Sequence, residues 1–258
     1  MTAHPFLSEG RADVLAHRGA SDARPPGNTL AAFRAALAMG CDHLETDVQC
    51  TSDGEIVVFH DERLDDLTTG TGTIAEHTWE ELASLRYVVD GRSTDDGLVR
   101  LDTVVTSFPD ARLNIDAKTD GVVEPLIALL RRHDMRLRVC IASFGWRRLR
   151  RLRRALGEGW CTALSQPEIV VTRVAAWLRL PVPRTGDVAQ LPRRFRAGGV
   201  SVTVIDRRLV EACHRAGIAV HCWTVDDPDA VSELFELGVD AVITDRPDVA
   251  LRVGRSHG

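Results

Sequence analysis

The chain alternates short runs of apolar residues with segments in which apolar residues recur at helical spacing. Short apolar or β-branched runs bounded by turn residues predict strands, and recurrence every three to four residues predicts helices. We predict core strands at residues 14–17, 43–48, 112–117, 137–142, 161–164, 200–205, 218–223 and 239–244. An additional strand at 56–60 follows the turn residues Ser52-Asp53-Gly54.

Helices are predicted between these strands, with recognisable start and stop signals. The first begins after Asn28-Thr29, which cap it, and Gly40 ends it. The last clear one begins with Asp227 as its cap and Pro228 at its first position. Others are predicted at residues 122–132, 146–156, 171–180 and 208–216.

Strands that alternate with helices are typical of parallel sheets with helical crossovers. Eight such units in about 250 residues favour an α/β fold of the (β/α)8, TIM-type barrel class. A doubly wound open sheet is the alternative. We expect one domain over residues 1–258, with its core at about 12–252. Residues 87–98 are polar and rich in turn formers, which predicts a small insertion after the second strand.

Composition narrows the class of protein. The 258 residues are 44% hydrophobic and 27% charged, which is typical of a globular protein, and the net charge is −5. That mild acidity argues against binding nucleic acid. The six cysteines are scattered without a CxxC pair, and the N-terminal segment lacks a basic start followed by an apolar stretch. We therefore expect a cytoplasmic protein with reduced thiols and no membrane span.

Charged and imidazole side chains follow several predicted strands. They are His17, Arg18, Glu45, Asp47, His60, Asp116 and Lys118. Glu45 and Asp47 are two residues apart on one strand and so point to the same face, and Asp116 and Lys118 form a second such pair. In a barrel, functional groups gather at the carboxyl ends of the strands. We therefore expect these side chains to converge.

The residue types in this set indicate phosphodiester chemistry. Three carboxylates without a cysteine ligand favour Ca²⁺ or Mg²⁺. Arg18 and Lys118 supply positive charge that suits a phosphate. Two histidines can serve as general acid and general base near neutral pH.

Longer motifs make the pattern specific. They are HRG at 17–19, PPGNT at 25–29, LETDVQCTSDGEIVVFHD at 44–61, TTGTG at 68–72, NIDAK at 114–118, ASF at 142–144, CWTVDD at 222–227 and GVDAVITDRP at 238–247. With these motifs the sequence resembles the glycerophosphodiester phosphodiesterase family over nearly its whole length. The resemblance implies a TIM-type barrel that hydrolyses glycerophosphodiesters, its small-molecule substrates, to an alcohol and sn-glycerol 3-phosphate with a divalent cation.

The resemblance also implies roles for single residues. His17 and His60 would be the acid and base, in either order. Arg18 and Lys118 would contact the phosphate, and Trp223 would line the pocket. The metal ligands would be Glu45, Asp47 and Asp116. The nucleophile would be water, or a substrate hydroxyl that gives a cyclic phosphate first.

The sequence departs from the family pattern at three positions. Gly27 and Asp66 stand where the family has Glu and Arg, and Asp116 replaces a Glu. The shorter Asp116 side chain withdraws the carboxylate by roughly 1.5 Å, one C–C bond, which favours a bridging water. These changes are compatible with an altered substrate or a weaker enzyme. Two alternatives therefore stay open: a lysophospholipase D-like enzyme acting on lysolipids, and a barrel that binds phosphodiesters with little turnover.

Other features receive structural interpretations. Residues 147–154 hold six arginines interrupted by leucines at helical spacing. A membrane-binding helix is possible, but an outer barrel helix with a solvated basic face is favoured. Asp245 follows the last strand and could face the barrel mouth, but a cap of the final helix is favoured. We expect His43 and His77 to lie at the surface or in loops. The tryptophans expected to pack are Trp79, Trp146, Trp160 and Trp177.

Overall fold

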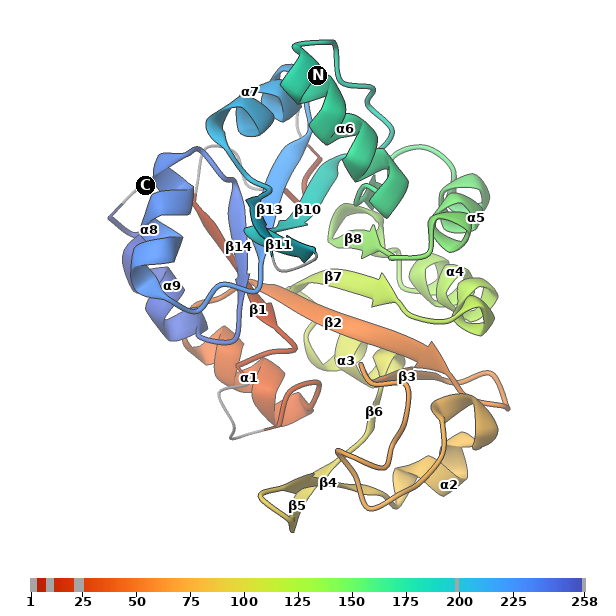
Figure 1. Ribbon diagram of the computed structural model, residues 1–258. Coiled ribbons are helices and arrows are strands. Elements are labelled where there is room, and N and C mark those ends of the chain that lie inside the picture. The colour runs from red at the N-terminus through yellow and green to blue at the C-terminus, as the bar shows by residue number, and fades with distance from the viewer. Residues whose placement is uncertain (1–3, 8–11, 21–25, 198–199, 257–258) are drawn as a thin grey trace.

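Eight parallel strands form a nearly closed barrel in the computed structural model, which describes residues 4–7, 12–20, 26–197 and 200–256 (Figure 1). They are β1 (Asp13–His17), β2 (His43–Cys50), β7 (Arg112–Ala117), β8 (Val139–Ala142), β9 (Cys161–Thr162), β10 (Val188–Pro192), β13 (Ala219–Trp223) and β14 (Ala241–Thr244). Each pairs with its neighbour in that order, and β14 returns to β1. Between β9 and β10 the contact is a single bridge from Ala163 to Val188.

Helices surround the strands, as the predicted (β/α)8 class requires. They are α1 (Leu30–Ala38), α3 (Leu101–Ser107), α4 (Val123–Arg132), α5 (Trp146–Leu156), α6 (Gln166–Leu178), α7 (Arg207–Arg215), α8 (Pro228–Glu236) and α9 (Pro247–Gly254). Leucines of α5 at 149, 152 and 156 are buried, so this arginine-rich helix packs as part of the ring. The barrel class predicted from the alternating pattern is confirmed.

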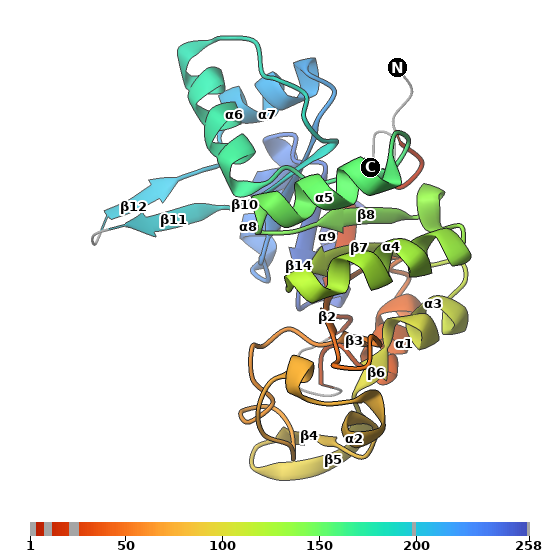
Figure 2. The same cartoon turned by 90° about the vertical axis from the view of Figure 1, so that its right-hand side faces the viewer.

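The segment after β2 forms the expected insertion. It contains β3 (Ile56–Val58), a short 3-10 turn at Ile74–Glu76, α2 (Trp79–Ala83), β4 (Arg86–Val89), β5 (Arg92–Gly97) and β6 (Val99–Arg100). Strand β3 runs antiparallel to β2. A small core that includes Phe59, Leu64 and Leu82 fills the insertion. Figure 2 shows it projecting below the barrel.

One predicted core strand is wrong. Residues 200–205 do not enter the barrel, because β12 (Val200–Thr203) pairs antiparallel with β11 (Arg194–Ala197) in a separate hairpin. Figure 2 shows this hairpin projecting beyond the barrel. The sixth barrel strand is β10 instead. The alternation in VSVTV is typical of a strand with one solvated face, whereas barrel strands are buried on both faces.

Two local predictions also need correction. Helix α6 begins at Gln166 and not at 171, because Ser165 and Glu168 form a capping box before it. His43 is not at the surface: it is buried, and its Nε2 lies 2.8 Å from the carbonyl oxygen of Phe6. The predicted caps Thr29 of α1 and Asp227 of α8 are confirmed, since each side chain accepts a hydrogen bond from its helix.

The tryptophan and cysteine side chains differ in their burial. Trp146 and Trp177 are exposed and do not pack in the core, contrary to the prediction. All six cysteines are buried with free thiols. Among the described residues, no helix has both the length and the apolar character needed to cross a bilayer.

Candidate active site

The end of β1 bends sharply to place His17 and Arg18 beside β2. Arg18 has a φ of 54°, in the left-handed region that costs a side chain conformational energy. The Arg18 N–H donates to Oε2 of Glu45 at 3.2 Å, which holds this turn against β2. A Cβ atom at Gly19 would lie 2.6 Å from the backbone of Ala32, so the third residue of the HRG motif must be glycine.

Asn28 connects the PPGNT segment to the same site. Its Nδ2 donates to Oδ2 of Asp47 at 3.3 Å, and its Oδ1 accepts from Thr46 at 2.8 Å. The next residue, Thr29, caps α1. The motif therefore orients a site carboxylate and starts a helix at the same time.

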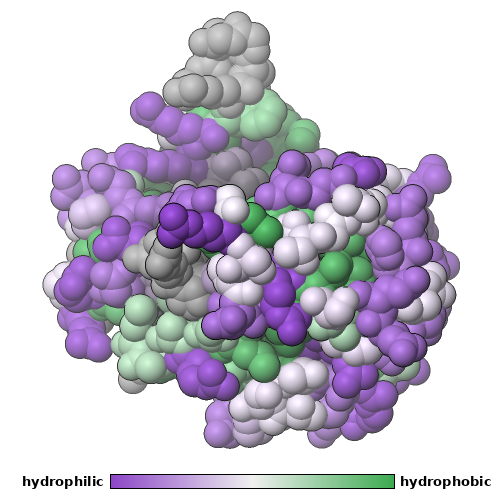
Figure 3. Space-filling view, turned by 90° about the horizontal axis from the view of Figure 1, so that it is seen from below, coloured by the Kyte–Doolittle hydropathy of each residue, from purple (hydrophilic) through white to green (hydrophobic). Residues whose placement is uncertain are grey.

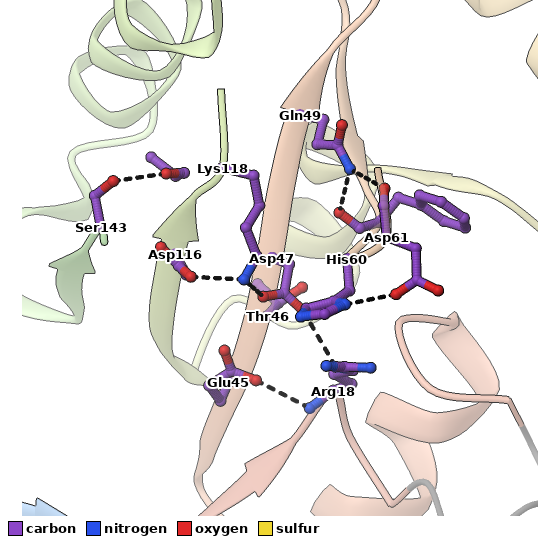
Figure 4. A network of polar contacts seen from close by, with 12 residues as sticks. Arg18, Glu45, Thr46, Asp47, Gln49, His60, Asp61, Asp116, Lys118 and Ser143 are labelled. Atoms are coloured by element: carbon purple, nitrogen blue, oxygen red, sulfur yellow. Dashed lines mark hydrogen bonds and ion pairs between the residues drawn. The ribbon is translucent and has the colours of Figure 1, made fainter. Parts of the chain in front are cut away.

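Lys118 lies between two carboxylates of adjacent strands (Figure 4). Its Nζ is 2.8 Å from Oδ1 of Asp47 and 2.7 Å from Oδ2 of Asp116. Arg18 approaches Asp47 from the other side, with Nε 3.3 Å from Oδ2. Register places Asp47 and Asp116 opposite one another across the β2–β7 pair. Two cations and three carboxylates, including Glu45, thus share one end of two strands.

Burial and these charges set the protonation of the carboxyl groups. Burial, together with Asp47 and Asp116, raises the pKa of Glu45 well above its ordinary value. Burial also raises the pKa of Asp116, against the opposing effect of Lys118. For Asp47 the effect of burial is outweighed by Lys118 and Arg18, so its pKa is lowered. Burial opposes the Lys118 charge, but both carboxylates raise the pKa of Lys118 overall, which keeps it protonated.

Each of the two predicted acid–base histidines has a carboxylate at Nδ1. Nδ1 of His17 lies 2.7 Å from Oδ1 of Asp245, and Nδ1 of His60 lies 2.6 Å from Oδ1 of Asp61. A carboxylate there fixes the proton on Nδ1 and leaves Nε2 for chemistry. Nε2 of His17 is 3.9 Å from Oε2 of Glu45, so it points toward the carboxylate cluster.

All eight residues predicted for the site line one pocket of about 200 Å³ at the carboxyl ends of the strands. They are His17, Arg18, Glu45, Asp47, His60, Asp116, Lys118 and Trp223. Asn114 and Gln190 also line the pocket, and Gln190 donates to Asn114 at 2.7 Å. Phe144 stands edge-on to Trp223 with ring centroids 5.9 Å apart. The pocket lining thus combines charged groups with an aromatic pair.

The carboxylates have the donor chemistry of a site for a hard divalent cation. Oδ1 of Asp116 is buried and lacks a hydrogen-bond partner among the described residues, so it has capacity for a ligand. Burial and the neighbouring carboxylates raise the pKa of Glu45, and a cation would relieve that repulsion. Within the described ranges, no three His, Cys, Asp or Glu side chains already stand in metal-binding geometry, because Lys118 separates Asp47 from Asp116.

For Asp245 the preferred interpretation, a cap of the final helix, is wrong. Arg246 occupies the cap position of α9, and Asp245 faces His17, in line with the alternative that it faces the barrel mouth. The TDRP motif was visible, whereas the partner 228 residues away was not. Lys118 carries a second overlooked signal: the chain has 31 arginines and no other lysine.

Two of the departures from the family pattern, Gly27 and Asp66, differ in how close they lie to the pocket. Asp66 is an exposed residue of the insertion, outside the described lining of the pocket. Gly27 directly precedes Asn28, which binds Asp47. The charge missing at Gly27 is therefore next to the carboxylate cluster, while the change at Asp66 is remote from it.

Most of the chain matches a known protein family. Residues 17–249 match the model of the glycerophosphoryl diester phosphodiesterase family. The probable glycerophosphodiester phosphodiesterase 2 of Mycobacterium tuberculosis is 35% identical over 252 residues, covering 95% of this chain and 91% of that protein. A glycerophosphodiester phosphodiesterase of Caldanaerobacter subterraneus subsp. tengcongensis is 31% identical, covering 95% and 98%.

Solved structures share the fold. A crystal structure described as a glycerophosphoryl diester phosphodiesterase from Silicibacter pomeroyi superposes with a TM-score of 0.80 at 23% identity, covering 98% of this chain and 96% of that chain. An Oleispira antarctica phosphodiesterase, solved with the product sn-glycerol-3-phosphate, gives a TM-score of 0.76 at 23% identity, covering 94% and 96%.

Proposed function

Because the chain belongs to the glycerophosphoryl diester phosphodiesterase family, whose members are phosphoric diester hydrolases, we propose that it cleaves small glycerophosphodiesters to an alcohol and sn-glycerol 3-phosphate. The observation that carries the proposal is the single pocket that holds both histidines, three carboxylates, Arg18 and Lys118. The Oleispira antarctica phosphodiesterase of the same fold holds that product. One barrel domain would carry the whole activity.

Arg18 and Lys118 would bind the phosphate. Both lie on the pocket wall, and Lys118 faces it from between Asp47 and Asp116. Their charges would stabilise the extra negative charge that develops on phosphorus as the nucleophile adds. The ion pair between Arg18 Nε and Asp47 would help to hold the guanidinium in position before substrate arrives.

A divalent cation, Ca²⁺ or Mg²⁺, would be held by Glu45, Asp47 and Asp116. When bound it supplies Lewis acidity and orients the glycerophosphoryl group. Lys118 would balance whatever negative charge the cation leaves on Asp47 and Asp116. Asn28 would keep Asp47 in position through its amide N–H group.

The two imidazoles would move the protons. One histidine takes the proton of the attacking hydroxyl, either from water or from the substrate, and the other gives a proton to the departing alkoxide. Asp245 and Asp61 would hold the Nδ1 protons of His17 and His60, and the Nε2 atoms would exchange protons with the substrate. The apolar wall at Phe144 and Trp223 would face the leaving group.

The test is release of sn-glycerol 3-phosphate from glycerophosphocholine and glycerophosphoethanolamine, with Ca²⁺, Mg²⁺ or EDTA. Release that needs a cation and is lost in His17→Ala would support the proposal. Lysophosphatidylcholine forms a third arm, because cleavage of that substrate alone would favour the lysophospholipase D-like alternative. No release from any of the three would support a barrel that binds phosphodiesters without turnover. The cytoplasmic location stays a prediction.

A further inference from the structure

Positive charge and exposed apolar side chains are concentrated in the same part of the chain. Residues 144–207 hold thirteen arginines and four acidic residues, in a protein whose net charge is −5. Of the twelve large hydrophobic side chains exposed among the described residues, ten lie between Phe144 and Val202. Scattered exposed apolar residues need no explanation, but a cluster marks an interaction site.

The β11–β12 hairpin is one part of this cluster. Phe195 and Val202 are directly paired across its two strands and are 58% and 52% exposed. The hairpin forms its own two-stranded sheet and has no further strand to pack on. Figure 2 shows it extending beyond the carboxyl ends of the barrel strands, and Figure 3 shows hydrophobic atoms beneath its grey tip. The projecting hairpin thus exposes an apolar pair.

Helix α6 carries the second part. Its exposed apolar side chains recur at i, i+1, i+4, i+7 and i+8, which is one face of a helix. They are Val170, Val171, Val174, Trp177 and Leu178. The opposite face, with Ala175 and Ala176, is buried, and the helix packs on α7. A surface helix normally turns polar side chains to solvent, whereas α6 exposes an apolar stripe in addition to its buried apolar face.

Arginines without carboxylate partners accompany these side chains. Arg148, Arg151 and Arg153 of α5 form ion pairs with Asp120, Glu124 and Glu168. In contrast, several exposed arginines of this segment have no ion pair with a described residue, among them Arg147, Arg150, Arg154, Arg179 and Arg194. Arg147 stacks over the exposed ring of Trp146 at 5.5 Å. Positive charge is thus available on α5, at the end of α6 and on β11.

We propose that this region is a docking surface for anionic lipid bilayers. The docking surface is made of Trp146, Val170, Val171, Val174, Trp177, Leu178, Phe195 and Val202, with Arg147, Arg150 and Arg194. Apolar side chains flanked by arginine and tryptophan insert at the headgroup boundary, and the cations attract acidic lipids.

The arginines and the apolar side chains of the docking surface together favour a bilayer over other binding partners. A second copy of the chain would bring the same unpaired arginines against each other, which is repulsive. A nucleic acid would use the arginines but gain nothing from a valine stripe on α6. An anionic bilayer satisfies both properties at once.

Docking would bring the pocket to the membrane. Gln166 and Ile169, in the first turn of α6, line the pocket, and Phe144, two residues before Trp146, also lines it. The surface therefore borders the pocket mouth. The consequence, preferred access to diesters at a membrane surface, rests on the proposed function, whereas vesicle binding does not.

Vesicle flotation tests the proposal with the full chain. We expect the wild type to float with vesicles of phosphatidylcholine and phosphatidylglycerol, and much less with phosphatidylcholine alone. Phe195→Ser combined with Val202→Ser should weaken binding at least about tenfold, since two apolar side chains no longer insert. Arg147→Gln combined with Arg194→Gln should weaken it about fivefold or more and reduce its dependence on salt.

Matched controls come from Met39 and Leu137, two exposed apolar residues outside both the docking surface and residues 144–207. Met39→Ser and Leu137→Ser should bind vesicles like the wild type, and every variant should hydrolyse soluble substrate equally. Absence of wild-type binding at low salt would overturn the proposal, as would full binding by the hairpin variant. So would a wild-type dimer in light scattering that the hairpin variant converts to monomer, since a second copy would then be the occupant.

Discussion

The imidazole of His17 and the carboxylate of Asp245 meet at 2.7 Å although 228 residues separate them in the chain. Strand β1 pairs with β14, and closure of the barrel thereby brings the first strand against the last. The contact fixes the His17 ring with Nε2 toward the carboxylate cluster. Asp245 is therefore a positioning residue for the proposed chemistry.

Asp245→Asn should lower kcat by at least about tenfold while KM changes little, because an amide no longer holds the required tautomer. The pH–rate profile should also change on the limb that reports His17. Asp248→Asn is the matched control, since Asp248 is nearby but pairs with Arg246 and Arg252. An Asp245→Asn profile that matches the wild type would contradict a positioning role.

His17→Ala and His60→Ala should each lower activity at least about a hundredfold, the usual scale for acid–base catalysis. A glycerophosphoryl p-nitrophenyl ester distinguishes the general acid from the general base, because p-nitrophenolate leaves without being protonated. Only the variant that lacks the general acid should recover on that substrate. His214→Ala, an exposed histidine paired with Asp240, serves as control. Wild-type turnover in either variant would remove that histidine from the mechanism.

Lys118→Met should destabilise the protein by about 3 kcal/mol at neutral pH, because Asp47 and Asp116 would lose the cation between them. Urea unfolding measures this loss, and added Ca²⁺ or Mg²⁺ should restore part of it.

Lysine acetylation gives an independent test, since Lys118 is the only lysine. Acetylation should abolish activity, and substrate bound beforehand should protect. An acetylated Lys118 with full activity would rule out phosphate binding by its ammonium group.

Cation binding should strengthen as the pH rises. Burial, Asp47 and Asp116 raise the pKa of Glu45, so a cation competes increasingly with a proton for this carboxylate as the pH falls. Calorimetric titration in two buffers of different ionisation enthalpy should detect proton release on binding of Ca²⁺ or Mg²⁺. Glu45→Gln should reduce that release, and what remains would come from Asp116, whose pKa is also raised by burial. Equal affinity across the acidic range, without proton release, would contradict a role for Glu45 as ligand.

Stability should fall in acid because of His221. This side chain is buried, its Nδ1 has no hydrogen-bond partner among the described residues, and burial with the nearby His43 lowers its pKa to about 3. Between that value and the ordinary 6.5, the unfolded chain binds a proton that the folded chain does not, so stability decreases as the pH falls. From pH 7 to pH 5 the loss should be about 2 kcal/mol.

Urea unfolding at the two pH values measures this slope. His221→Gln should flatten it, whereas His214→Gln, at an exposed position, should leave it unchanged. Equal slopes in His221→Gln and the wild type would show that other groups control acid stability.

The sequence determined the barrel class, the ring of helices and the side chains of the pocket. Local rules sufficed for these: α5 was predicted at its observed bounds, and Glu45 with Asp47 share a face because they are two residues apart on a strand. Placement at strand ends was enough to predict that the seven charged and imidazole residues converge, since parallel strands end together, whereas Trp223 was predicted from the family resemblance.

Only the tertiary structure decided which distant groups meet. The VSVTV segment alternates like any half-exposed strand, and nothing local says that it forms a projecting hairpin while the less regular residues 188–192 enter the barrel. The same holds for Asp245, whose local sequence resembles a helix cap and whose partner is set by ring closure. The position of Lys118 between two carboxylates depends on the β2–β7 register, because hydrogen bonds between strands, and not neighbours in sequence, fix those distances.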